Sequence, residues 1–282
     1  MSENSIEHDM NTYSPKEYWS GVADRAGGDD AAGFAPVLHP DAPEWFNRLI
    51  DDLQWRAVRK AIEIARIPPG ARILDVGCGT GRWLRRYLRF GFQPAGVDAT
   101  QSMLRLARSR QTVSPLVAGE AFRLPFADDA FDCVSDITVV QHIPVELQPA
   151  ALAEMMRALK PGGALILFEL IRGHGTHIFP HEPKDWIQQV TRLGGELNRW
   201  YGQEFLLFDR AFVRLARAIA RRQITSPQLN APAAPIKSRS GVQNVSWGLR
   251  HATATVSAWF ESTAQMILPQ SIATHGVFVF RK

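Results

Sequence analysis

The chain has 282 residues, of which 45% are hydrophobic and 21% are charged, and this composition excludes a disordered or fibrous protein. The formal net charge of +4 is not gathered in one block, so we expect no nucleic-acid partner. The only two cysteines, Cys78 and Cys133, exclude a disulfide-rich scaffold. The N-terminus is polar, and no run of about 18 apolar residues occurs, so we expect a cytoplasmic protein without membrane insertion.

The first part of the chain is expected to be an arm. Residues 1–42 are rich in Gly, Asp, Ala and Pro, and they predict an N-terminal arm or lid with one short helix near 14–22. From 44 to 66, apolar residues recur at the spacing of a helix face, and the Pro-Pro-Gly run at 68–70 ends that pattern.

Past residue 70 the sequence alternates between two periodicities. Short apolar runs bounded by Gly or Asp predict strands, and the segments between them predict helices at 82–90, 101–110 and 146–159. The LKPGG stretch at 159–163 is expected to be a turn that ends a helix and leads into the next strand. Such alternation predicts βαβ units, and hence an α/β fold with a parallel sheet covered on both faces.

The last third of the chain departs from this alternation. We expect helices at 184–193, 209–222 and 247–267, strands at 196–201 and 275–280, and a polar linker at 225–241. These elements predict one domain over 43–282, with a core at 71–201 and 273–282. A helical cap over 202–272, carrying the flexible linker 225–241, is inserted between the last two strands.

The run Ile73–Gly81 (ILDVGCGTG) carries the most chemical information. An apolar strand ends in Asp75, and three alternating glycines then lead into a helix that starts near Arg82. Glycines allow a ligand to lie against the backbone and allow positive φ, while the helix N-terminus offers free N–H groups. Asp98 ends the next strand about twenty residues later, where a carboxylate can accept hydrogen bonds from a ribose. A nicotinamide dinucleotide enzyme is the alternative, although its glycine spacing differs.

Five ordered motifs resemble those of class I S-adenosylmethionine-dependent methyltransferases, in the type 11-like group related to ubiquinone methyltransferases. They are ILDVGCGTG, GVDAT, VAGEAFRLPFADDAFDCVSD, SDITVVQHIP and LKPGGALILFE, and the resemblance covers about 71–171. It implies a Rossmann-like, seven-stranded, mostly parallel sheet with helices on both faces. It also implies S-adenosyl-L-methionine as the cofactor.

The resemblance assigns roles to residues of these motifs. Gly77, Gly79 and Gly81 would pass under the methionine part of the cofactor beside Cys78, and Asp75 would orient the amino group. Asp98 would hold the ribose hydroxyls, and Ala99, Glu120 and Ala121 would lie at the adenine. Further implied cofactor contacts are Met103, Phe122, Asp136, Ile137 and Tyr18.

Two residues are candidates for the general base. His142 follows the fourth strand and Glu169 ends the fifth, so both are expected at the edge where ligands bind. Glu169 lies in an apolar run, and a buried carboxylate there indicates a polar role. A structural role for His142 is the alternative. No metal site is expected, because no helical spacing fixes the histidines of the loop after Glu169.

The acceptor is expected to be a small molecule. His177, His181, Trp200 and Tyr201 are the candidate acceptor-binding residues. We expect a methyltransferase that methylates oxygen of a sugar or secondary metabolite. C-methylation of an isoprenoid or quinone-type precursor is the alternative within the enzyme class, and a non-catalytic cofactor-binding module is the alternative outside it. The sequence leaves a homodimer open.

Overall fold

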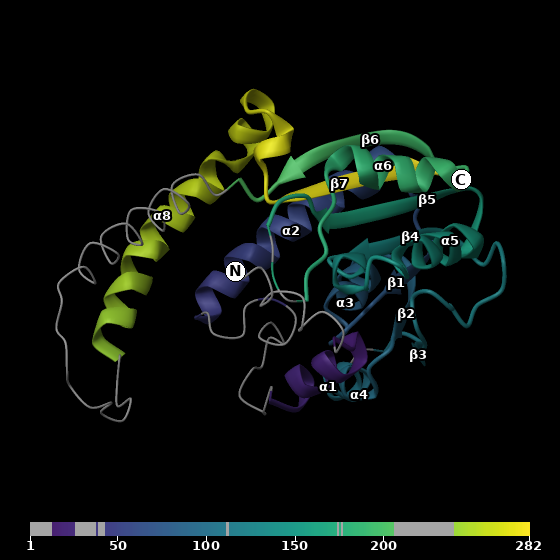
Figure 1. Ribbon diagram of the computed structural model, residues 1–282, viewed down its shortest axis with the longest axis horizontal. Helices are drawn as coiled ribbons and strands as arrows, with labels where there is room; N and C mark the ends of the chain where they lie inside the picture. The colour runs from purple at the N-terminus through teal and green to yellow at the C-terminus, as the bar shows by residue number, and fades with distance from the viewer. Residues whose placement is uncertain are drawn as a thin grey trace, which may run out of the picture.

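A seven-stranded sheet forms the centre of the molecule (Figure 1). The computed structural model describes residues 13–25, 38, 43–110, 113–173, 175, 177–205 and 240–282, and only the backbone of 240–250. The strands are β1 (Arg72–Val76), β2 (Gln93–Asp98), β3 (Leu116–Ala118), β4 (Phe131–Ile137), β5 (Leu159–Leu170), β6 (Glu196–Gln203) and β7 (His275–Arg281).

The strand order is β3-β2-β1-β4-β5-β7-β6. Strands β1 to β5 run parallel, whereas β7 lies antiparallel between β5 and β6. The chain leaves β1 toward β2 on one side and later adds β4 on the other. This creates a switch point beyond the carboxyl ends of β1 and β4, where open α/β sheets bind ligands. The Rossmann-like, mostly parallel sheet predicted from the sequence is confirmed.

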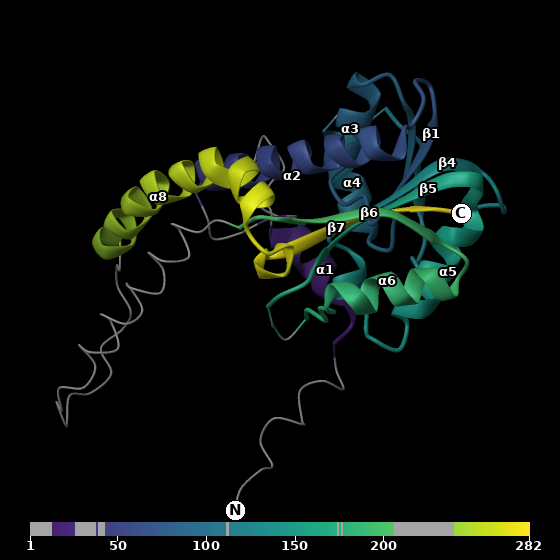
Figure 2. The ribbon, with the colours of Figure 1, turned by 90° about the horizontal axis from the view of Figure 1, so that it is seen from above.

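Helices cover both faces of the sheet (Figure 2). They are α1 (Pro15–Arg25), α2 (Glu44–Ala65), α3 (Arg82–Arg89), α4 (Gln101–Ser109), α5 (Gln148–Ala158), α6 (Pro183–Arg192) and α8 (Ser240–Ile267). Helices α2 and α3 pack on one face, and α5 and α6 pack on the other. Strand β7 is buried on both faces of the sheet. Val277 and Val279 point toward α2, and Phe278 and Phe280 are buried on the opposite side.

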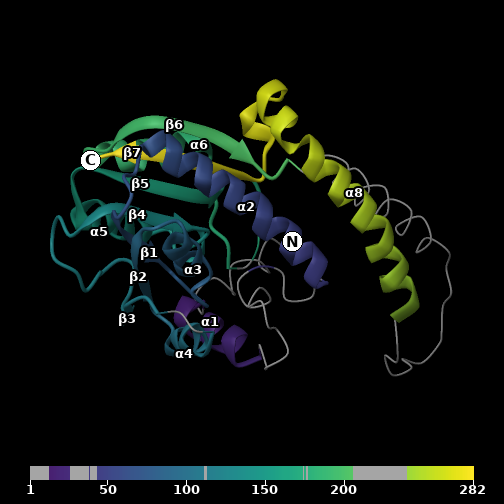
Figure 3. The same ribbon diagram turned by 180° about the vertical axis from the view of Figure 1, so that it is seen from behind.

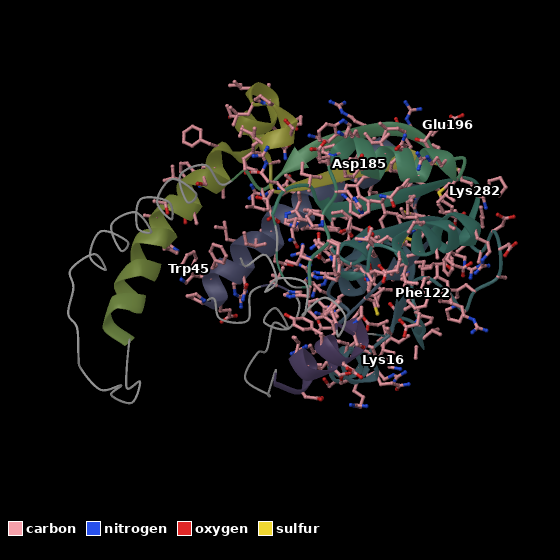
Figure 4. The ribbon with its side chains drawn as sticks, viewed as in Figure 1. Lys16, Trp45, Phe122, Asp185, Glu196 and Lys282 are labelled. Carbon is pink, nitrogen blue, oxygen red and sulfur yellow. The ribbon has the colours of Figure 1, made fainter. Side chains whose placement is uncertain are left out.

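Helix α8 extends away from the sheet and meets the N-terminal half of α2 (Figure 3). Phe46, Ile50 and Leu53 of α2 pack against Ala254 and Ala258 of α8. Figure 4 shows Trp45 at the end of α2 that faces α8, and its ring centroid lies 4.5 Å from that of His251. In the described part of the chain, no helix has both the length and the apolar character needed to cross a bilayer.

Several boundaries differ from those expected. The LKPGG stretch belongs to β5 instead of forming a separate turn, because Leu159 already pairs with Phe131 before a shift in register. Strand β6 continues to Gln203 because its pairing with β7 continues, so the expected cap at 202–272 begins two residues too early. Helix α8 starts at Ser240, within the expected linker 225–241. The rest of that linker and the expected helix at 209–222 lie outside the described residues.

Candidate active site

The turn between β1 and α3 is a cradle of backbone atoms. Gly77, Gly79 and Gly81 all have positive φ, at 64°, 50° and 72°. The Gly81 N–H donates to the Cys78 carbonyl at 2.9 Å, which closes the turn. A Cβ at Gly77 would lie 2.5 Å from Cγ2 of Val139, so a side chain has no room there. Glycine is therefore required at Gly77 by both conformation and space.

Asp98 fastens this cradle to the end of β2. Its Oδ2 accepts a hydrogen bond from the Gly79 N–H at 2.8 Å, and its Oδ1 accepts one from the Thr100 N–H at 2.8 Å. Burial raises the pKa of Asp98, and these two N–H donors oppose the rise. Each carboxylate oxygen keeps a further lone pair, so Asp98 can also accept hydrogen bonds from a pair of ligand hydroxyls.

A cavity of about 760 Å³ lies above the carboxyl ends of the strands, within the range of about 300–1,000 Å³ typical of small-molecule sites. Most of the residues predicted from the sequence line it. They are Tyr18, Gly77, Cys78, Gly79, Asp98, Ala99, Met103, Glu120, Ala121, Phe122, Ile137, His142 and His177.

Asp75 and Gly81 lie just behind the cavity wall. Asp75 is buried, and burial raises its pKa to about 8. Its Oδ1 accepts a hydrogen bond from the Ser135 hydroxyl at 3.2 Å, whereas Oδ2 is buried with no donor among the described residues. Gly81 caps the start of α3. An unpaired acceptor and a cradle that a Cβ would fill both fit a ligand that carries an amino group and lies against the backbone.

The structure places Glu169 away from the cavity, which corrects its expected role as the base. Its side chain is fully buried, and its carboxylate accepts hydrogen bonds from the N–H groups of Val139, Val140 and Gln141 at 2.9, 3.0 and 2.9 Å. Asp136 is likewise fully buried and does not reach the cavity. Both carboxyls lie beneath the loop after β4, so neither can meet an acceptor.

His142 lines the cavity, but both ring nitrogens are occupied. Nδ1 lies 2.9 Å from the His177 carbonyl oxygen, and Nε2 lies 3.3 Å from the side-chain nitrogen of Gln141. Burial lowers the pKa of His142 to about 4. The imidazole is therefore neutral near pH 7 and a weak base, and its ring stacks on that of His177 with centroids 5.4 Å apart.

Three expected acceptor contacts lie elsewhere in the fold. His181 Nε2 is 2.6 Å from the Gln148 side-chain oxygen, and its ring packs on Trp186. Trp200 packs on Phe278 in the core, because its position in β6 faces α6 instead of the cavity. The Tyr201 hydroxyl donates to the Ala57 carbonyl at 2.6 Å. None of the three lines the cavity.

The sequence reasoning missed a polar pair in the cavity wall. Glu204 follows β6 and His275 begins β7, and Oε2 of the glutamate lies 3.0 Å from Nδ1 of the histidine. The Gln54 side chain donates to the other glutamate oxygen, Oε1, at 3.0 Å. Glu204 has φ of 61°, a conformation that is costly outside glycine and that concentrates at functional sites. Because β6 and β7 are antiparallel, the end of one meets the start of the other, and no local signal reveals this pairing.

Aromatic rings close the side of the cavity formed by the N-terminal arm. Tyr18 of α1 stacks on His177 with centroids 4.3 Å apart, and Trp19 meets the His142 ring edge-on at 5.1 Å. The Tyr13 hydroxyl donates to the His142 carbonyl at 3.1 Å. Within the described ranges, no group of three or more His, Cys, Asp or Glu side chains is arranged to hold a metal ion.

Comparison with known proteins agrees with this geometry. Residues 74–167 match the family model described as "Methyltransferase domain". That segment contains the glycine cradle, Asp98, strands β2 to β4 and most of β1 and β5. This part of the chain is a class I S-adenosylmethionine-dependent methyltransferase domain, as the sequence motifs predicted.

Two curated relatives and one solved structure illustrate the similarity. The chain is 36% identical over 158 residues to the ubiquinone/menaquinone biosynthesis C-methyltransferase of Bordetella avium, covering 51% of this chain and 60% of the relative. It is 35% identical over 123 residues to the malonyl-[acyl-carrier protein] O-methyltransferase of Erwinia pyrifoliae, covering 43% and 46%. The chain thus spans about half the length of the curated relatives it matches.

Structural similarity to solved proteins covers more of the chain than the sequence matches do. A putative sarcosine dimethylglycine methyltransferase from Galdieria sulphuraria has a similar structure, with a TM-score of 0.55 and 15% identity over 95% of this chain and 98% of that one. At this identity the similarity shows the fold alone.

Proposed function

We propose that this protein transfers a methyl group from S-adenosyl-L-methionine to a small-molecule acceptor. The glycine cradle held by Asp98 at the switch point of the sheet carries this proposal. When bound, the cofactor supplies an electrophilic methyl group on sulfur. Gly77 and Gly79 would let it lie against the backbone, Asp98 would accept the ribose hydroxyls, and Asp75 would accept a hydrogen bond from the amino group.

The walls of the cavity favour an acceptor with an apolar, flat body. Trp19, Phe46, Ile50, Leu170 and Ile178 contribute apolar surface beside the cradle. A polyhydroxylated sugar needs a hydrogen-bonding partner for most of its hydroxyls, and apolar walls leave such groups unpaired. A hydroquinone-type ring is flat and has an apolar body with few hydroxyls to pair. One of the relatives above is named as a C-methyltransferase of quinone biosynthesis. Methylation of a sugar oxygen is the less favoured candidate.

His275 is the residue we propose as proton acceptor. Oε2 of Glu204 lies 3.0 Å from its Nδ1, which leaves Nε2 of the same ring as the atom that would take the proton. For a hydroquinone, Nε2 would take the hydroxyl proton, which makes the ring carbon nucleophilic toward the methyl group that the cofactor would supply. Once the ring carbon carries the methyl group, its C–H proton would pass to solvent and Nε2 would return its proton to the phenolate oxygen, which restores the aromatic hydroquinone. His142, with both nitrogens engaged, would serve as a wall of the cavity.

Cofactor binding is tested with Asp98→Ala. Removing the carboxylate deletes two hydrogen bonds that hold the turn and the acceptors for the ribose, so affinity for S-adenosylhomocysteine should fall at least about 100-fold in isothermal titration calorimetry. Asp185→Ala, on α6 behind the sheet, is the control and should bind like the wild type. Wild-type affinity in Asp98→Ala, or no binding by the wild type, would contradict the proposal.

The chemical step is tested with His275→Gln. Methyl transfer from labelled cofactor to 1,4-naphthohydroquinone should fall at least about tenfold, which corresponds to about 1.4 kcal/mol of barrier. Affinity for S-adenosylhomocysteine should stay close to that of the wild type, because the base acts on the acceptor. Equal turnover in both proteins would remove His275 from the mechanism. Cofactor binding without transfer to hydroquinones, sugars or a cell extract would identify a binding module.

A further inference from the structure

The loop after β4 is a structural part of the cofactor cradle. Thr138 starts it with a positive φ of 61°, and its N–H donates to the Phe168 carbonyl at 2.7 Å. The Val139 side chain then packs against Gly77, and Thr138, Val139 and Gln141 line the cavity. A non-glycine residue in this conformation costs about 1–2 kcal/mol, so neighbouring contacts must hold the loop in place.

Glu169 provides those contacts. Its Oε1 accepts the Val139 and Val140 N–H groups, and its Oε2 accepts the Gln141 N–H. The side chain of Gln141 returns to the same strand, since its oxygen accepts the Leu170 N–H at 2.6 Å. Three N–H donors around one carboxyl stabilise its ionised form. Burial nevertheless raises the pKa of Glu169 to about 7, so Glu169 carries a charge above that pH, and three consecutive backbone groups of the loop are tied to it.

Asp136 is the neighbour of this charge. It pairs in register with Leu167, and Glu169 is two residues further along β5, so both carboxyls are on one face of the sheet. Both side chains are fully buried, and within the part of the chain that the structure describes neither oxygen of Asp136 receives a hydrogen bond. Burial and the adjacent Glu169 raise the pKa of Asp136 well above its usual range. Asp136 is thus the carboxyl that keeps its proton beside Glu169.

We propose that Asp136 and Glu169 share one proton and together hold the loop 138–141 against the glycine cradle, so that loss of the proton at alkaline pH releases the loop and weakens cofactor binding. The two residues are positioning residues that act through the loop. The part that concerns the cofactor rests on the proposed function. The effect on the loop itself does not, because it changes the stability of the folded chain.

Other ionisable groups face the pair from the surrounding elements. Asp75 is on β1 at the opposite face of the sheet, His142 is in the loop, His181 precedes α6 and His275 begins β7. Burial lowers the pKa of His142 to about 4 and also lowers that of His181, so both stay neutral at alkaline pH. Asp75, with its pKa raised to about 8, titrates in the tested range and needs its own control.

The test uses Asp136→Asn, because an amide copies a protonated carboxyl and cannot lose that proton. The dissociation constant for S-adenosylhomocysteine is measured at pH 7 and pH 9 by calorimetry. We expect it to rise at least about tenfold more in the wild type than in Asp136→Asn. The amino group of the ligand also titrates over this range, but it changes the dissociation constants of both proteins equally and so does not affect the comparison between them. Asp185→Asn, on α6 and away from the cavity, is the control and should keep the wild-type ratio of the two constants. The exchange of Asp136 for Asn is also measured in an Asp75→Asn background, where the titration of Asp75 is absent from both proteins, and the same difference should remain.

Thermal unfolding without ligand tests the pair independently of the proposed function. The folded state keeps a proton that the unfolded chain releases near the ordinary carboxyl pKa, so stability falls as pH rises toward the folded pKa. The melting temperature should therefore fall from pH 7 to pH 9 in the wild type and fall less in Asp136→Asn. Glu169→Gln should melt lower at pH 7, because its amide nitrogen cannot accept the N–H groups of the loop.

The outcomes separate the two proposals. If the wild type does not bind S-adenosylhomocysteine, the proposed function fails, while the melting curves still decide whether the pair shares a proton. If Asp136→Asn keeps the wild-type pH dependence of both affinity and melting, the shared proton is excluded. A Glu169→Gln protein that melts like the wild type would show that the carboxylate does not hold the loop.

Discussion

Gly77 shows how a single position can combine backbone and packing requirements. Its φ of 64° is costly for any residue with a side chain, and a Cβ would also collide with Val139, whose branched side chain cannot easily turn away. Gly91 provides a matched comparison, because its φ is 80° and a Cβ there would meet nothing within 4 Å. The two positions therefore separate backbone strain from displacement of the loop after β4.

We predict that Gly77→Ala damages the site beyond its effect on the backbone. Gly91→Ala should cost about 1–2 kcal/mol of unfolding free energy, the price of a left-handed conformation alone. Gly77→Ala should cost more and should weaken S-adenosylhomocysteine binding at least about tenfold, since Val139 must move. Urea unfolding and calorimetry measure the two effects. Equal behaviour of the two variants would show that the Val139 contact is unimportant.

The sequence around Glu169 predicted that this residue has a polar role but not which groups it binds. A carboxylate within an apolar strand correctly indicated a polar role, because burying the charge without partners is costly. The partners themselves are backbone N–H groups 28 to 30 residues earlier in the chain, and no pattern of residue types identifies them. The glycine cradle and Asp98 were predictable for the opposite reason. Their chemistry depends on spacing along one strand–turn–helix unit, which the sequence displays directly.

At the scale of the elements, periodicity predicted most helices and strands, while contacts between elements had to come from the structure. Asp51 of α2 is an example, since its buried carboxylate pairs with Arg82 of α3 at 2.9 Å and also with Arg86. Its neighbour Asp52 is 67% exposed and lies 3.8 Å from Arg86. The helical pattern of 44–66 predicts α2 but gives no partner for either aspartate. The same applies to Glu204 and His275, which meet only because β7 inserts antiparallel beside β6.

At the scale of the whole molecule, segments from both ends of the chain enclose the cavity. The N-terminal side supplies Tyr18, Trp19 and Val22 of α1, and α1 is attached through Val22 and Ala23 to Met103 of α4. The C-terminal side supplies Thr274 and His275. The cavity is also lined by Lys16, labelled on α1 in Figure 4, so α1 contributes polar as well as aromatic groups. A ligand that touches α1 would link it to the sheet.

Helix α1 should therefore become more protected when the cofactor site is filled. We predict that S-adenosylhomocysteine slows amide hydrogen exchange in Pro15–Arg25 at least about tenfold, because local opening of α1 must then break ligand contacts. Amides of α6 (Pro183–Arg192), behind the sheet, are the internal control and should exchange at an unchanged rate. Tyr18→Ala, which removes the ring stacked on His177, should reduce the protection of α1 by the ligand. Equal exchange of α1 with and without ligand would mean that this helix lines the cavity without closing over the cofactor.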